Sequence, residues 1–179
     1  MQTCSAAMTI APDDKETFLL LLDQHGGIIR KVAGGYSSSL ADRNDLTQEI
    51  TLQLWKAYPR YSPDRPFSTW MYRIALNVAI SFLRTNTRPV RQTMPLEEIG
   101  HEIADESGAS SETAERIAIL QQVISALDPF DRALVMLYLD DHSYREIAEI
   151  LGVTETNIAT KLSRLKQHVG RKISQITGE

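Results

Sequence analysis

The segment from Ser143 to Gln167 carries the clearest arrangement of side chains for binding a charged polymer. Ser143 and Glu146 have the spacing of a capping box, which starts a short helix, and Gly152 allows the left-handed turn that ends it. A second amphipathic helix with basic residues follows, capped by Thr154. Two helices joined by a tight turn form a helix-turn-helix, whose second helix enters the major groove of DNA.

The second helix of this motif presents polar side chains on its outward face. Hydroxyl and amide groups can read base edges, and cationic groups bind phosphates. An ordinary helical hairpin with a solvated polar face is the alternative, but the helix caps and the basic flank together favour DNA binding. The candidate DNA-reading residues are Thr156, Asn157, Thr160, Lys161 and Arg164.

A second group of side chains interleaves cations with aromatic rings around a loop that contains three prolines, PRYSPDRPF. Rings can stack on unpaired bases while guanidinium groups hold the backbone, which is how proteins bind single-stranded DNA. The alternative is that the rings are core residues, and we expect two of Phe67, Trp70 and Tyr72 to be buried. The candidate residues are Arg60, Tyr61, Arg65 and Phe67 in the loop, and Arg73, Asn77 and Arg84 along one stripe of the following helix.

A third group places Asp42, Asp45, Gln48 and Glu49 near the start of another predicted helix. The helix dipole favours carboxylates there, so simple N-terminal capping is an alternative to a functional surface. Paired acids also suggest acid–base catalysis, but no nucleophile, metal-ligand set or glycine-rich phosphate loop accompanies them. The single cysteine and the four scattered histidines offer no metal-ligand spacing. We therefore predict a protein that is not an enzyme and that needs no cofactor and no metal.

The elements that must position these groups are all helical, because apolar residues recur at helical spacing and nowhere alternate with a period of two for long. We predict two small helical domains, at 13–92 and 112–174, joined by an acidic flexible linker at 93–111. The pattern predicts one helix through Phe18 that ends near Gly34 and Gly35, helices over 45–58 and 68–84, one through 117–127, one starting at Asp128-Pro129, and the two helices of the helix-turn-helix.

Charge and hydropathy narrow the class of protein further. The net charge is −4, but seven acids and no Lys or Arg lie between Met94 and Glu115, and the rest of the chain then carries +3. Two basic domains joined by an acidic linker fit a nucleic-acid partner. The longest apolar run, Phe18 to Leu22, is far too short for a membrane span. The N-terminus does not have the pattern of a secretory signal, so we expect a cytoplasmic protein.

Two motifs, in this order, resemble the extracytoplasmic-function (ECF, group 4) sigma factors of bacterial RNA polymerase. The segments Asp45–Trp55 and Phe67–Asn77 resemble region 2 of that family, and Leu127–Arg132 with the helix-turn-helix resembles region 4. The resemblance covers about residues 14–92 and 115–172. It implies a factor that binds core RNA polymerase and directs promoter-specific transcription initiation.

The resemblance also implies a role for each group of residues. The last helix would read the minus-thirty-five element, and the proline-rich loop with the helix after it would capture and melt the minus-ten element. Region 4 would contact the polymerase flap, and an anti-sigma factor is a possible partner. A free-standing helix-turn-helix regulator and an all-helical adaptor without DNA contacts are the alternatives. The residues that match the surface for the clamp of the large polymerase subunit are Asp42, Asp45, Leu46, Gln48, Glu49 and Trp55.

One departure from the family pattern suggests a modification site. Arg43 and Asn44 dilute the acidic cluster at the start of the clamp-binding helix. Thr51 and Thr47 lie one turn apart beside that cluster, and a phosphate would add about −1.5 to −2 charges. We expect Thr51 to be the better candidate, because Thr47 is predicted in the first turn, where local capping would occupy its hydroxyl. The alternative is that both are ordinary exposed threonines.

Overall fold

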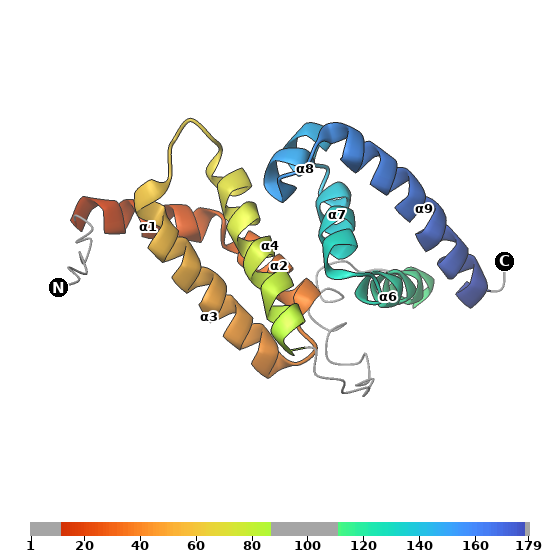
Figure 1. The fold of residues 1–179 in the computed structure, drawn as a ribbon. Helices are drawn as coiled ribbons and strands as arrows, with labels where there is room; N and C mark the ends of the chain where they lie inside the picture. Colours follow the sequence, from red (N-terminus) through yellow and green to blue (C-terminus); the bar gives the residue numbers. More distant parts are fainter. Residues whose placement is uncertain (1–11, 87–110, 178–179) are drawn as a thin grey trace, which may run out of the picture.

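The computed structural model describes residues 12–86 and 111–177 of the chain. These residues form helices arranged in two groups (Figure 1). No strand occurs within the two described ranges, and the prediction of an all-α protein is confirmed. The predicted acidic linker, 93–111, lies outside the described residues apart from its last position.

The first domain contains four α-helices and one short 3₁₀ turn. They are α1 (Pro12–Gln24), α2 (Gly26–Tyr36), α3 (Leu40–Ala57), η1 (Tyr58–Arg60) and α4 (Phe67–Asn86). Leu46, Ile50 and Leu54 recur every four residues on α3 and are fully buried, so this helix has one apolar face. On α4, Met71 and Ala75 are buried in the same way, because α4 packs against both α2 and α3.

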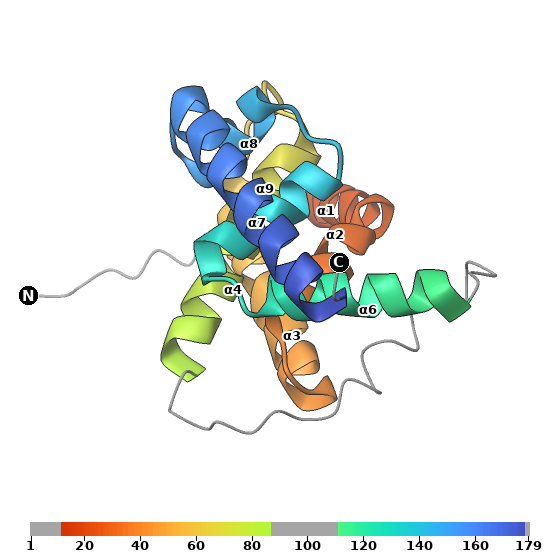
Figure 2. The ribbon, with the colours of Figure 1, turned by 90° about the vertical axis from the view of Figure 1, so that its right-hand side faces the viewer.

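The second domain contains α6 (Ser111–Ser125), α7 (Pro129–Leu139), α8 (Tyr144–Leu151) and α9 (Glu155–Thr177). The helix starts follow the predicted caps: the Asp128 carboxylate accepts hydrogen bonds from the backbone N–H groups of Phe130 and Asp131. Ser143 and Glu146 form the predicted capping box, and Gly152 ends α8 with a φ of 69°. α6 packs on α9 (Figure 2).

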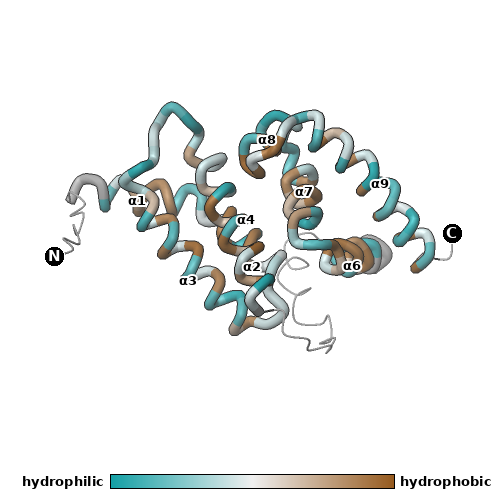
Figure 3. Tube along the Cα trace, in the orientation of Figure 1, coloured by the Kyte–Doolittle hydropathy of each residue, from teal (hydrophilic) through white to brown (hydrophobic). Residues whose placement is uncertain are grey.

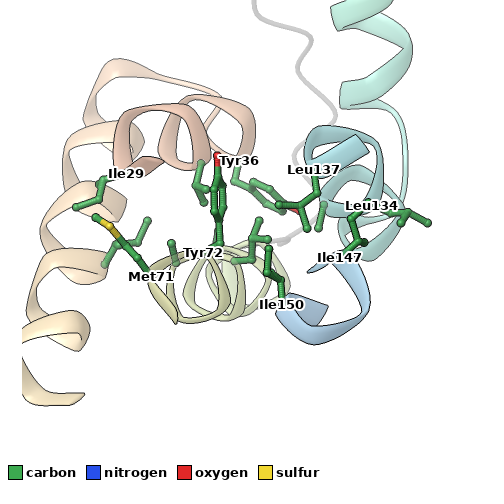
Figure 4. Close-up of a cluster of buried hydrophobic side chains, with 14 of the residues drawn as sticks. Ile29, Tyr36, Met71, Tyr72, Leu134, Leu137, Ile147 and Ile150 are labelled. Carbon is green, nitrogen blue, oxygen red and sulfur yellow. The ribbon is translucent and has the colours of Figure 1, made fainter. Parts of the chain in front are cut away.

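The two domains pack against each other along α4. Both α7 and α8 contact α4, and one continuous hydrophobic core cluster includes residues of both domains. Figure 4 shows Tyr36 and Tyr72 of the first domain beside Leu137 and Ile150 of the second. The hydropathy colouring agrees with this packing of the domains along α4. Hydrophobic residues gather on α4 and α7, while α9 is largely hydrophilic (Figure 3).

Two helix boundaries differ from those predicted. The single helix predicted through Phe18 is two helices, α1 and α2, because the chain turns at His25 in front of two glycines with low helix propensity. The helix predicted from Asp45 starts at Leu40, because the Ser39 hydroxyl caps it by accepting a hydrogen bond from the Asp42 N–H at 3.1 Å.

The capping box gives a stability prediction. Ser143→Ala removes the hydroxyl that accepts from the Glu146 N–H, so we expect the free energy of unfolding to fall by about 1 kcal/mol in a chemical denaturation experiment. Hydrogen bonds from Ser143 hold the pKa of Glu146 below its ordinary value. The bond from the Ser143 hydroxyl to the Glu146 carboxylate is therefore present at neutral pH and lost as the pH falls through that pKa, so the difference between the variant and the wild type should narrow in acid. It should not vanish, because the bond from the Glu146 N–H does not depend on ionisation. Ser163→Ala, on the exposed face of α9, is the control and should change stability little; an equal loss in both variants would contradict the role of the cap.

Candidate nucleic-acid and polymerase interfaces

The outward face of α9 is built by burying its opposite side. The Asn157 N–H donates to the Thr154 hydroxyl at 3.3 Å at the start of the helix. Ile158, Leu162 and Leu165 are buried, which fixes the rotation of α9 about its axis. All five predicted DNA-reading residues are consequently exposed: Thr156, Asn157, Thr160, Lys161 and Arg164.

Contacts with α7 orient two cations on α9. The Lys161 ammonium lies 3.2 Å from a carboxylate oxygen of Asp131 and 5.1 Å from the centre of the Phe130 ring. Five residues later on the same helix, Lys166 donates a hydrogen bond of 2.8 Å to the Tyr138 hydroxyl, which raises the pKa of the lysine. Both side chains remain exposed and charged, so the surface of α9 next to α7 is cationic.

A pocket of about 260 Å³ lies on the predicted single-strand surface of α4. Arg73 and Asn77 are exposed one turn apart and both line it, whereas Arg84 is exposed farther along the helix and does not. The side chains that line the pocket are Arg65, Thr69, Trp70, Arg73, Ile74 and Asn77 from the first domain, and Glu149 from α8.

Aromatic rings in tilted and edge-to-face contact support this pocket. The centre of the Tyr61 ring lies 5.1 Å from that of Trp70 and 5.3 Å from that of Phe67, and the Tyr61 hydroxyl donates to the Arg65 carbonyl at 2.9 Å. Phe67 and Tyr72 are buried, as expected for two of the three rings. Phe67 therefore corrects our site prediction: it supports the loop from inside and is only 6% exposed. Trp70, which our candidate set left out, is half-buried and lines the pocket.

The predicted clamp-binding residues lie on α3. Asp45, Gln48 and Glu49 are exposed, and Asp42 is half-buried beside Ser38, whose hydroxyl donates to it at 2.9 Å. Leu46 is fully buried and supports α3 from the core, which corrects its assignment to a contact surface.

Trp55 and Thr51 are two further predicted positions on α3, and both of their side chains are half-buried. Trp55 is half-buried, with its ring centre 5.1 Å from that of Phe18. The Thr51 hydroxyl donates to the Thr47 carbonyl at 2.8 Å. Thr47 is not in the first turn of the helix as predicted, because α3 starts at Leu40.

Two family models match the two domains: Sigma-70 region 2 over residues 21–89 and Sigma-70 region 4 over residues 117–169. Two helical domains in this order, with a helix-turn-helix in the second, define a sigma factor, the class of protein that directs RNA polymerase to promoters.

Similar proteins indicate which kind of sigma factor this chain is. The chain is 28% identical to the RNA polymerase sigma factor CnrH of Cupriavidus metallidurans over 171 residues, which cover 89% of this chain and 88% of CnrH. It is 24% identical to the ECF RNA polymerase sigma-E factor of Escherichia coli over 173 residues, covering 91% and 90%. The fold matches the sigma factor RpoE of Bartonella quintana, solved in complex with the anti-sigma factor NepR, with a TM-score of 0.62 at 19% identity, covering 92% and 98%.

The chain belongs to the extracytoplasmic-function sigma factors. It directs promoter-specific transcription initiation, and its partners are RNA polymerase and promoter DNA. No helix in the described part of the chain is long and apolar enough to cross a membrane. Within that part, no cluster of three or more His, Cys, Asp or Glu side chains is placed to hold a metal ion.

The hydrogen bond from Tyr61 to Arg65 gives a prediction about the loop. Tyr61→Phe keeps the ring but removes the donor, so we expect faster exchange of the Arg65 amide, which donates to the Ser62 carbonyl, and a loss of about 1 kcal/mol of local stability. Hydrogen exchange followed by mass spectrometry measures this, with Tyr144→Phe as a control that should leave the loop unchanged. Unaltered exchange in Tyr61→Phe would mean that the contacts between the aromatic rings alone hold the loop.

Proposed function

We propose that the two domains divide the promoter between them, with α9 reading the minus-thirty-five element as duplex DNA. The exposed stripe from Thr156 to Arg164 supports this, because it begins at the N-terminal end of α9, and that end of a recognition helix contacts base edges. Asn157 and Thr160 are suited to bases, while Lys161 and Arg164 supply charge for phosphates.

We further propose that α4 and the loop before it bind the unpaired strand of the minus-ten element. The observation that carries this proposal is the pocket in which Arg73 and Asn77 lie beside the half-buried ring of Trp70. A flipped base can stack on an aromatic ring while a guanidinium binds its phosphate. Such binding offsets an unstacking cost of a few kcal/mol per base, so melting needs no cofactor and no catalytic step by this chain.

The exposed acids of α3 are proposed to bind the clamp of the large polymerase subunit, and region 4 is proposed to bind the flap. Asp45 and Glu49 lie four residues apart and therefore share one face of the helix. CnrH and RpoE were each solved with a protein partner, CnrY and the anti-sigma factor NepR respectively, and we propose an anti-sigma factor for this chain as well. Because its partner is RNA polymerase, we propose that it acts in the cytoplasm.

The division of the promoter between the domains is tested with two single variants. Arg164→Ala should weaken binding at the upstream element, lower the salt slope of that binding by about 1, and still melt a promoter supplied as a pre-opened bubble. Asn77→Ala should spare duplex recognition and impair opening. Permanganate footprinting of the holoenzyme on duplex and bubble templates distinguishes the two. Identical defects on both templates would contradict the proposal.

The clamp-binding surface is tested with the double variant Asp45→Ala and Glu49→Ala. It should lower the affinity for core polymerase by about 2 kcal/mol or more if these carboxylates are desolvated in the complex. Competition with a labelled sigma factor for core polymerase measures the loss. The matched control replaces Glu16 and Asp23, two exposed acids on α1, and should bind as the wild type does. If the two double variants bind equally well, α3 is not the contact.

Phosphorylation of Thr51 is proposed as a way to strengthen the binding of α3 to the polymerase clamp. A phosphate there adds about −1.5 to −2 charges one turn from Thr47 and Gln48, whereas Glu49, two residues away on the helix, does not face it. Thr51 is half-buried and its hydroxyl is bonded to the Thr47 carbonyl, so a kinase would have to break this bond first. Thr47 is equally half-buried and is the second candidate.

Comparing Thr51→Glu, Thr51→Ala and the wild type in core binding and run-off transcription tests the charge argument. Thr51→Glu should raise both activities several-fold, and Thr51→Ala should not exceed the unmodified wild type. The same pair of substitutions at Thr47 separates the two positions. A Thr51→Glu variant that gains nothing would show that added charge on this helix does not control core binding.

A further inference from the structure

The two cations of the exposed stripe on α9 differ in what surrounds them. The Lys161 ammonium lies 3.2 Å from a carboxylate oxygen of Asp131 and 5.1 Å from the centre of the Phe130 ring. The side chain of Arg164, three residues later, makes no hydrogen bond or ion pair within the part of the chain that the structure describes. One cation of the proposed DNA-reading surface is therefore already paired with an anion, and the other is not.

The start of α7 holds both partners of Lys161 in place. Pro129 is the first residue of α7, and the Asp128 carboxylate caps the helix by accepting from the Phe130 and Asp131 N–H groups at 2.9 and 3.1 Å. Phe130 and Asp131 therefore lie in an ordered first turn. Because α7 packs against α9, this turn reaches a lysine that follows Asp131 by 30 residues in the chain.

Two attractions act on the Lys161 ammonium at this position. The side chains of Lys161 and Asp131 are 44% and 30% exposed, so water and salt screen their ion pair less than they screen a fully exposed one. The face of the Phe130 ring attracts the same ammonium through its negative potential. Both attractions are lost when Lys161 moves to a phosphate, so DNA must compete with α7 for this lysine.

Lys166 shows that a position beside α7 does not by itself balance the charge of a lysine. Its ammonium donates to the Tyr138 hydroxyl at 2.8 Å and lies 4.1 Å from the centre of that ring. A hydroxyl and a ring carry no net charge, so the positive charge of Lys166 stays available to phosphates. The carboxylate of Asp131 is what sets Lys161 apart.

Pairing of Lys161 with Asp131 affects two kinds of DNA binding differently. Phosphate contacts are the same at every sequence and supply nearly all of non-specific binding. The hydroxyl and amide groups of Thr160 and Asn157 are suited to base edges, which differ between sequences. Reading base edges with these groups does not require Lys161 to leave Asp131, whereas binding a phosphate with Lys161 does. The ion pair therefore lowers sequence-independent binding and leaves base reading intact.

We propose that Asp131 determines promoter specificity by holding Lys161 on α7, which withholds this cation from the DNA backbone and limits the affinity of α9 for non-promoter duplex. The role of α9 in reading duplex DNA rests on the proposed function. Asp131 acts through Lys161 and is therefore a positioning residue.

Binding of the full chain to a fluorescent random-sequence duplex of about 20 base pairs, measured over a series of salt concentrations, tests this role. Asp131→Asn should bind about threefold more tightly than the wild type, the factor expected for a partly exposed ion pair that no longer competes. The slope of log affinity against log salt should steepen by about 0.9, because one more phosphate is bound. Asp131→Glu keeps the carboxylate and should bind as the wild type does.

A charge control and a double-mutant cycle show whether the gain acts through Lys161. Glu155→Gln removes an exposed acid of α9 whose side chain has no ion pair or hydrogen bond in the described ranges, so it should not steepen the salt slope. In a Lys161→Gln chain, Asp131→Asn should change affinity and slope no more than Glu155→Gln does. An equal gain with and without Lys161, or an unchanged slope in Asp131→Asn, would overturn the proposal. Partial unfolding cannot imitate the expected gain, since loss of the α9 surface lowers DNA affinity.

The holoenzyme measures the consequence for specificity. Run-off transcription from a promoter pool with a randomised upstream element should use a broader set of sequences with Asp131→Asn than with the wild type, and an identical set would refute the role in specificity. Failure of the proposed function has a different signature: Arg164→Ala and Lys161→Gln would then leave duplex affinity and salt slope unchanged. If only the present proposal fails, Arg164→Ala still weakens duplex binding, and Asp131→Asn has no effect.

Discussion

The burial of α4 on two sides is the constraint on which the rest of the structure depends. On one side it packs against α2 and α3 of its own domain, and on the other it meets α7 and α8 of the second domain. Only a narrow stripe of α4 stays in contact with water, and that stripe carries Arg73 and Asn77. The helix that would bind single-stranded DNA is therefore also the helix that joins the two domains.

This dual use of α4 explains why polar groups cluster at the domain interface. An interface made only of apolar side chains would resemble a permanent core and would be costly to separate. Here the apolar contacts are accompanied by an ion pair and by hydrogen bonds from Tyr36 and Arg132 to backbone carbonyls, groups that water can satisfy once the domains part.

The charges of the chain are separated in a way that fits its two partners. Acidic residues lie on α3, which faces away from the second domain, while cations lie on α4 and α9. Carboxylates repel the phosphates that arginine and lysine attract, so DNA and polymerase are directed to different faces. The separation is incomplete, since Arg43 and Lys56 lie on α3. Glu149 is an acid that lies among the cations of the α4 surface.

The sequence by itself determined the helical class, the helix-turn-helix and most helix ends, because these depend on contacts between residues three or four positions apart. Asp128, Ser143 and Gly152 act within one turn of their own helices. Only the tertiary structure decided that Leu46 and Phe67 are buried and that Asp140 meets Lys31, 109 residues away, and Tyr72, 68 residues away. Periodicity shows that a helix has an apolar face but not which neighbour covers it, so contacts between distant segments are fixed only by how the helices pack.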